Sequence, residues 1–171
     1  MLDLIRSMGD LPTADQVAEQ AGLSRRTVFR LFEDLEKLHL AAIAAQRAEV
    51  IELFPPPMSA SSLSEAIDAL VDHRAALYEH VAPIRRVAQR LTRSSEIVKR
   101  EQTQTRAQLR MHLNLLVGAY LPAERREREE TLDAVQVTTS WATWEVLRED
   151  HGHDIAHAKR VIKRMLRPLF D

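Results

Sequence analysis

Residues 13–32 read TADQVAEQAGLSRRTVFRLF, and this stretch decides the fold. The pattern predicts two short helices joined by a tight turn. Thr13 follows Pro12 and can cap the first helix, because its hydroxyl accepts a hydrogen bond from a backbone N–H that has no partner within the helix. Gly22 falls at the turn, where glycine enters the left-handed region of backbone space without steric cost. Ser24 is placed to cap the second helix.

The apolar residues of this stretch recur at helical spacing, so each predicted helix has one inner side. Ala18 is small, as a close crossing of the two helices requires. The residues that we expect to face inward are Val17, Ala18 and Ala21 in the first helix and Val28, Leu31 and Phe32 in the second.

The outward face of the second predicted helix is basic. It carries Arg25, Arg26, Thr27 and Arg30, and no acidic residue lies between Ser24 and Phe32. Arginine pairs bidentately with guanine edges, and arginine, threonine and helix N-termini all bind phosphate. Such a helix is typical of proteins that read DNA in the major groove. The alternative is an ordinary helical hairpin whose arginines form a solvated face.

Residues 17–38, VAEQAGLSRRTVFRLFEDLEKL, resemble the DNA-binding signature of TetR/AcrR-type repressors. Phe29 stands where that family usually has a tyrosine. Leu35 falls where a lysine usually opens the fourth helix, with Lys37 as the candidate replacement. The resemblance implies a helix-turn-helix DNA-binding domain at 1–47 and a helical ligand-binding and dimerisation domain at 48–171. The residues that it places against double-stranded DNA are Thr13, Ser24, Arg25, Arg26, Thr27, Phe29, Arg30 and Lys37.

Composition predicts an all-α protein with a sizeable core. Of the residues, 45% are hydrophobic and 29% charged, glycines number four, and no alternating strand pattern with hairpin turns appears. No apolar run reaches the ~18 residues of a membrane span, and the N-terminus has no basic region followed by an apolar stretch, so we expect a cytoplasmic protein with no membrane partner. The absence of cysteine excludes disulfides and cysteine–zinc sites.

The remaining helices are separated by prolines. Residues 55–57 are three prolines that end a long fourth helix. The next helix is expected to end near Val81, with Pro83 starting another. The last two helices are expected at 131–150 and 154–170. Their apolar residues, more than a monomer covers, are Leu132, Val135, Val137, Thr139, Trp141, Ala142, Trp144, Val146 and Leu147, then Ile155, Ala158, Ile162, Met165 and Leu169. This surplus predicts a homodimer through a four-helix bundle.

Catalytic motifs are missing from the sequence. It has no glycine-rich phosphate loop, Gly-x-Ser-x-Gly elbow or His-Glu-x-x-His helix, so we expect neither an enzyme nor a cofactor. His151, His153 and His157 come near a metal-ligand set. The alternative, which we favour, is that His151 caps the negative end of the preceding helix and Gly152 forms the turn, with no metal bound.

The family resemblance also implies a small-molecule site between the middle helices. Such sites are mostly apolar with a few polar anchors. The candidate lining residues are His73, Tyr78, Met111, His112, Trp141 and Trp144, and the alternative for each is a core or dimer position. The sequence thus predicts a ligand-responsive repressor that binds a palindromic operator as a homodimer and is released by a small molecule. The alternative is a helical dimer that binds a ligand or a protein and has lost DNA binding.

Overall fold

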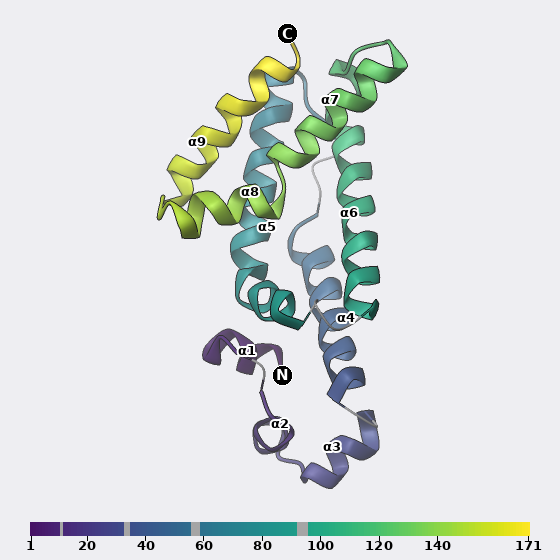
Figure 1. The fold of residues 1–171 in the computed structure, drawn as a ribbon, viewed down its shortest axis with the longest axis vertical. Helices are drawn as coiled ribbons and strands as arrows, with labels where there is room; N and C mark the ends of the chain where they lie inside the picture. Colours follow the sequence, from purple (N-terminus) through teal and green to yellow (C-terminus); the bar gives the residue numbers. More distant parts are fainter. Residues whose placement is uncertain (11, 33–34, 56–58, 92–95) are drawn as a thin grey trace. The chain divides into compact units, whose positions relative to one another are not determined.

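The computed structural model describes residues 1–10, 12–32, 35–55, 59–91 and 96–171, and all regular structure within these ranges is helical (Figure 1). The predicted all-α class is confirmed. No helix in these ranges is long and apolar enough to cross a membrane. The chain forms two compact units, Met1–Pro55 with His80–Lys99, and Pro56–Glu79 with Arg100–Asp171. The functional domains at 1–47 and 48–171 stay a prediction, since they divide the chain by role and not by compactness.

The first unit is built from short helices followed by a long one. Its elements are α1 (Leu2–Met8), α2 (Ala14–Ala21), α3 (Arg25–Phe32), α4 (Leu35–Leu53), the end of α5 (Leu63–Leu91) and the beginning of α6 (Glu96–Val117). The sequence also favours Asp34 as the cap of the fourth helix and a helix break near residues 92–95. Both predictions lie outside the described residues.

Both predicted caps and the predicted turn of the 13–32 stretch are confirmed. The N–H of Gln16 donates to Thr13 Oγ1 at 3.3 Å, and the N–H of Thr13 donates to Gln16 Oε1 at 2.8 Å, which forms a capping box. Gly22 has φ 65° and closes α2, because its N–H donates to Glu19 O at 3.1 Å while the N–H of Leu23 donates to Ala18 O at 2.8 Å. This Schellman closure fixes the direction in which the chain enters α3.

A small apolar cluster holds α2 against α3. It consists of Val17, Ala18 and Val28, with Met1, Leu4 and Phe32 packed on it. The expectation that Ala21 and Leu31 also face inward is wrong, since both are exposed, Leu31 by 60%. Ala21 is the last residue of α2, next to the turn. Leu31 lies about 60° around α3 from Val28, on the side away from Phe32, so the narrow helix crossing does not reach it.

A second cluster of the first unit packs α1 on the end of α5. Ile5, Ile84 and Val87 are buried together, with Met1 and Leu2 beside them. Arg6 extends from the same helix to Glu49 on α4, with Nη2 at 2.6 Å from Oε2. His80 Nε2 lies 3.3 Å from the other oxygen of that carboxylate. The hydrogen bond from Arg6 is the main reason that the pKa of Glu49 lies below its usual value.

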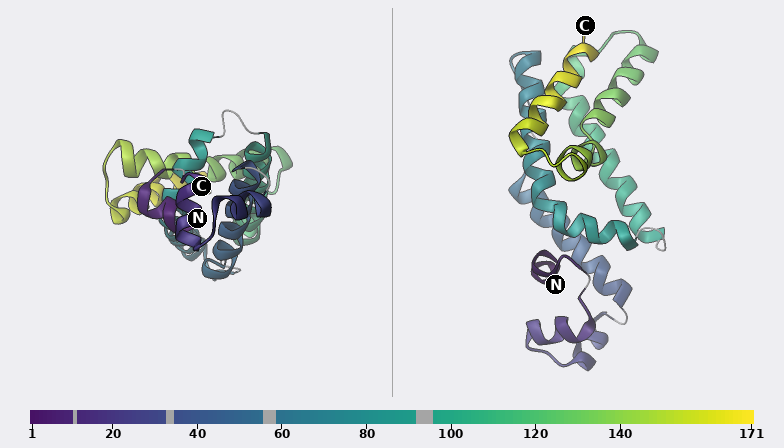
Figure 2. Two further views of the ribbon diagram at one scale, coloured as in Figure 1. Left: turned by 90° about the horizontal axis from the view of Figure 1, so that it is seen from below. Right: turned by 60° about the vertical axis from the view of Figure 1, so that its left-hand side comes forward.

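The second unit is a helical body. Its elements are the first part of α5, most of α6, the 3-10 turn η1 (Gly118–Tyr120), α7 (Arg125–Thr138), α8 (Trp141–Glu145), the π-helical turn η2 (Val146–Asp150), α9 (Ile155–Leu166) and η3 (Arg167–Leu169). Figure 2 shows α9 alongside the first part of α5, where Lys163 pairs with Asp68 at 2.7 Å and Lys159 with Asp72 at 2.9 Å. The most deeply buried side chains of this unit include Val71, Leu113, Val117, Val135, Trp144 and Leu166.

The prediction that Pro83 starts a helix is wrong, because Pro83 lies inside α5. Proline within a helix removes one backbone hydrogen bond and crowds the preceding turn, at about 3 kcal/mol. Its neighbours Ala82 and Ile84 are only 8% and 4% exposed. Burial of this apolar surface, which the sequence rule for proline ignores, keeps the segment helical.

The predicted single helix at 131–150 is also wrong, since it breaks after Thr138. Ser140 caps a new helix by accepting from the N–H of Thr143 at 3.2 Å. Thr139 supports the break, because its hydroxyl donates to Val135 O at 2.8 Å. Several of the apolar residues of the last two predicted helices are exposed. They are Val137, Ala142 and Val146 here, and Ile155 and Met165 on α9.

Candidate nucleic-acid interface and ligand site

The N-terminus of α3 is capped by Ser24, and a second hydroxyl, that of Thr27, lies beside the cap. The N–H of Thr27 donates to Ser24 Oγ at 3.1 Å, and the two hydroxyls lie 2.9 Å apart. The cap directs the chain into an eight-residue helix whose first N–H groups carry the positive end of the dipole. Ser24 and Thr27 are therefore fixed beside a helix end suited to a phosphate group.

Two arginines of α3 are exposed and available to a partner. Arg26 and Arg30 lie in solvent, and neither is paired with a carboxylate of the residues that the structure describes. Arg25 differs from them, because its Nη1 lies 3.3 Å from Asp15 Oδ2 on α2. Its guanidinium also lies over the ring of Phe29, 5.6 Å from the centroid. Arg25 is thus partly neutralised and held, whereas Arg26 and Arg30 present uncompensated charge.

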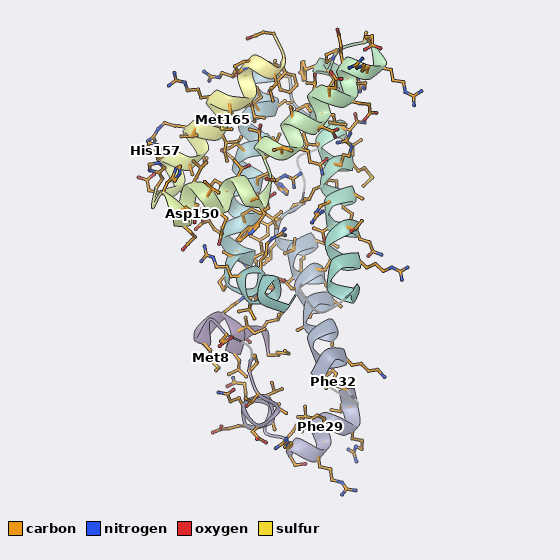
Figure 3. The ribbon with its side chains drawn as sticks, in the orientation of Figure 1. Met8, Phe29, Phe32, Asp150, His157 and Met165 are labelled. Carbon is orange, nitrogen blue, oxygen red and sulfur yellow. The ribbon has the colours of Figure 1, made fainter. Side chains whose placement is uncertain are left out.

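The other predicted DNA-contacting residues are Phe29 on α3, Thr13 at the start of α2 and Lys37 on α4. Phe29 and Phe32 both belong to α3, as Figure 3 shows, and Phe29 is half-buried under Arg25. The hydroxyl of Thr13 donates to Gln16 Oε1 at 3.0 Å, so the Thr13 side chain is engaged in capping α2. Lys37 is exposed near the start of α4. All eight predicted residues belong to the first compact unit.

Three of the predicted ligand-binding residues form an aromatic cluster in the second unit. The ring of Tyr78 meets Trp141 edge-on at 5.7 Å and lies 6.4 Å from Trp144. All three are buried, and Tyr78 donates its hydroxyl hydrogen to Thr139 O at 2.9 Å. This bond joins α5 to the residue at which α7 ends.

A carboxylate fixes the polar edge of this cluster. Trp144 Nε1 donates to Glu79 Oε1 at 2.9 Å. Arg148 donates to both oxygens of Glu79, from Nε at 2.8 Å and from Nη2 at 3.1 Å, and from Nη1 to the backbone oxygen of His153. The bond to Glu79 is the main reason that the pKa of Arg148 is raised. Trp144 and Glu79 are therefore held by the fold before any ligand binds.

Arg74 is a charged residue in the middle of the apolar side of α5, and it is only 3% exposed. Its Nη2 donates to Leu109 O at 3.0 Å, while Nη1 is buried and has no hydrogen-bond partner among the described residues. Burial lowers the pKa of Arg74, and nearby Tyr78 acts in the opposite direction. The sequence analysis did not select Arg74. The signal was a cation four residues after Leu70, in an otherwise apolar stripe.

His112 on α6 lies within electrostatic reach of Arg74. Its Nδ1 is buried and, within the described part of the chain, has no hydrogen-bond partner. Burial lowers the pKa of His112, and the charge of Arg74 lowers it further. Of the other two predicted lining residues, His73 is half-buried and Met111 is 56% exposed. Arg74 Nη1 and His112 Nδ1 are thus two buried polar atoms of this unit that have no hydrogen-bond partner among the described residues.

The three histidines near the start of α9 lie close together. The rings of His153 and His157 stack at 4.0 Å, and the ring of His151 meets His153 edge-on at 5.7 Å. His157 is labelled in Figure 3. Burial and the two neighbouring rings lower the pKa of His153. Within the described ranges, no group of three or more histidine, cysteine or acidic side chains is arranged to hold a metal ion.

No protein-family model, curated protein or solved structure matches this chain. Its function is therefore inferred from the residues described above.

Proposed function

We propose that this protein is a transcriptional regulator of the TetR/AcrR type, a repressor that binds a palindromic operator as a homodimer and is released by a small molecule. The observation that carries the proposal is the pair of exposed arginines, Arg26 and Arg30, on the capped helix α3. The same helix is anchored on its other side by Val28, which is 2% exposed. A helix that reads DNA needs one face packed against the protein and an opposite face with positive charges that no carboxylate neutralises.

In this proposal, some groups of α3 contact DNA phosphates and others contact base edges. The Ser24 and Thr27 hydroxyls and the first N–H groups of α3 are suited to phosphate oxygens, which position the helix without reading sequence. Arg26 and Arg30 supply planar donors that match the N7 and O6 acceptors of guanine in the major groove. Arg25 contributes less free charge, since Asp15 pairs with it. Sequence reading in this proposal therefore depends mainly on Arg26 and Arg30.

Homodimerisation is supported by apolar side chains left exposed on the body. Val137, Val146, Ile155 and Met165 are 67%, 41%, 42% and 46% exposed, and Figure 3 labels Met165 on α9. A two-fold dimer through residues 131–150 and 154–170 would cover such residues and would supply two reading helices for a two-fold operator. A ligand releases the operator only if it binds better to the dimer state that fits DNA poorly.

The direct test is binding of the purified protein to the DNA upstream of its own gene, with random DNA as competitor and at two salt concentrations. The proposal predicts a specific shift with two protomers per site. Salt should weaken it, because binding releases counterions from the DNA and added salt reduces the free-energy gain of that release. A folded dimer that binds random and upstream DNA equally, or binds neither, would reject it. That result would favour a helical dimer that recognises a ligand or a protein.

A further inference from the structure

The buried guanidinium of Arg74 needs an anion that the described chain does not supply. It is 97% buried, yet no described carboxylate pairs with it, and a single carbonyl oxygen, that of Leu109, accepts from Nη2. The half-buried arginines Arg6 and Arg148, in contrast, each pair with a carboxylate, that of Glu49 and that of Glu79. A buried charge without a counter-charge is unfavourable, so a group retained in this state is a candidate for binding one.

A structural role alone explains Arg74 poorly. Within the described part of the chain, Nη2 is the guanidinium nitrogen with an acceptor, whereas Nη1 is buried and has no hydrogen-bond partner. An apolar side chain of the same length, such as methionine, would fill this position of α5 without an unpaired charge. Its neighbours Leu70, Val71 and Leu77 on the same helix face are buried and apolar.

We propose that Arg74 binds the carboxylate of an apolar monocarboxylic acid, which is the effector of the proposed regulator. We assign the ligand a single negative charge because of the charges of Arg74 and His112. Burial and Arg74 both lower the pKa of His112, so the free site holds one positive charge, which matches a monoanion better than a phosphate dianion. The neutral His112 ring adds Nδ1, which donates to the second carboxylate oxygen when that nitrogen carries the hydrogen.

The apolar part of the ligand follows from the residues beside the guanidinium. Tyr78 interacts electrostatically with Arg74 and contacts the rings of Trp141 and Trp144. The three buried rings form an apolar cluster that is joined to the charge through Tyr78, and apolar groups with a few polar anchors are the usual composition of a small-molecule site. The inference rests on the proposed function for the role of the ligand, and on Arg74 and its neighbours for the chemistry of the ligand.

The test compares acids with their amides, which have nearly the same shape but no charge. The probes are benzoate, phenylacetate and octanoate, each beside benzamide, phenylacetamide or octanamide. Binding is read from tryptophan fluorescence, because the only two tryptophans of the chain, Trp141 and Trp144, lie in the aromatic cluster. We expect at least one acid to bind tenfold or more tightly than its amide. If no acid is preferred to its amide, the proposal is wrong.

Two variants assign this preference to Arg74. Arg74→Met should abolish the difference between acid and amide, while Arg106→Met, which removes an exposed arginine from α6, should keep it. In ligand-free buffer, Arg74→Met should have the same melting temperature as the unmodified protein or a higher one, because an unpaired buried charge is removed. Persistence of the preference in Arg74→Met, or a clear loss of melting temperature, would overturn the proposal in favour of a structural arginine.

Inorganic phosphate is the competing probe. Phosphate binding that depends on Arg74, with no binding of the acids, would overturn the assignment to monocarboxylates. All these measurements are made without DNA, so a failure of operator binding leaves them unaffected. Conversely, an acid that binds through Arg74 but leaves operator affinity unchanged would reject the effector role in the proposed function and keep the site.

Discussion

Replacement of Gly22 by alanine tests how the turn between α2 and α3 controls DNA binding. Gly22 has φ 65° and ψ 28°, and a Cβ built there meets no atom within 4 Å. The penalty is therefore purely conformational, about 1–2 kcal/mol for alanine in the left-handed region. Part of this strain is relieved if α3 turns away from its native direction, which lowers the population of the DNA-binding form by up to ~5–30-fold.

The chain provides a matched control for this change. Gly152 also has φ 65° and no atom within 4 Å of a built Cβ, but it lies in the second unit, between η2 and α9. Denaturant unfolding should show a similar loss for Gly22→Ala and Gly152→Ala, while fluorescence anisotropy with operator DNA should show weakening for Gly22→Ala alone. Gly22→Asn should recover part of both losses, since asparagine tolerates this backbone region. Unchanged operator affinity in Gly22→Ala, or equal weakening in Gly152→Ala, would refute the link between the turn and the reading helix.

Two further predictions concern charges. Asp15→Asn should tighten DNA binding by roughly 1.5–5-fold in an anisotropy titration. The change releases Arg25 from an exposed ion pair of ~0.2–1 kcal/mol and removes a negative charge near the DNA phosphates. Unaltered or weaker binding would count against DNA contact by the basic face of α3. His112 has a lowered pKa in the folded protein, so the unfolded chain binds more protons below its ordinary value of 6.5. Stability therefore falls as the pH drops from about 6.5 through the folded pKa, and urea midpoints at pH 5.5 and 7.5 should differ less in His112→Gln; an equal difference in both proteins would contradict this reasoning.

Local signals in the sequence predicted the α2–α3 segment well. The capping box of Thr13, the left-handed Gly22 and the cap at Ser24 depend on residues at most a few positions apart, so the sequence contains all the information that they require. The exposure of Arg26 and Arg30 was predictable for the same reason. Leu31 was misassigned because its burial depends on how much of α3 the crossing helix covers.

Features that depend on packing between distant segments were not predictable. Pro83 remains helical because its neighbours are buried, and the helix break near Ser140 resets a stripe that looked continuous. Arg74 stands in an otherwise apolar stripe of α5, and its spacing alone does not mark it as a site residue. Its unpaired state is visible only once residues 35 positions apart, Arg74 and Leu109, are seen together. Sequence spacing indicates on which face of a helix a residue lies, but it does not show which distant segment packs against that face.

The most direct test of the central claim compares two double variants that remove the same charge from different surfaces. Arg26→Ala with Arg30→Ala acts on α3, and Arg160→Ala with Arg164→Ala acts on exposed positions of α9. Binding is measured by anisotropy with operator and random DNA over a salt series. If the α3 pair reads bases at ~1–3 kcal/mol for each arginine, its loss weakens operator binding about 30-fold or more, while the α9 pair changes it little. Equal weakening by both pairs, or none by the α3 pair, would contradict α3 as the reading helix.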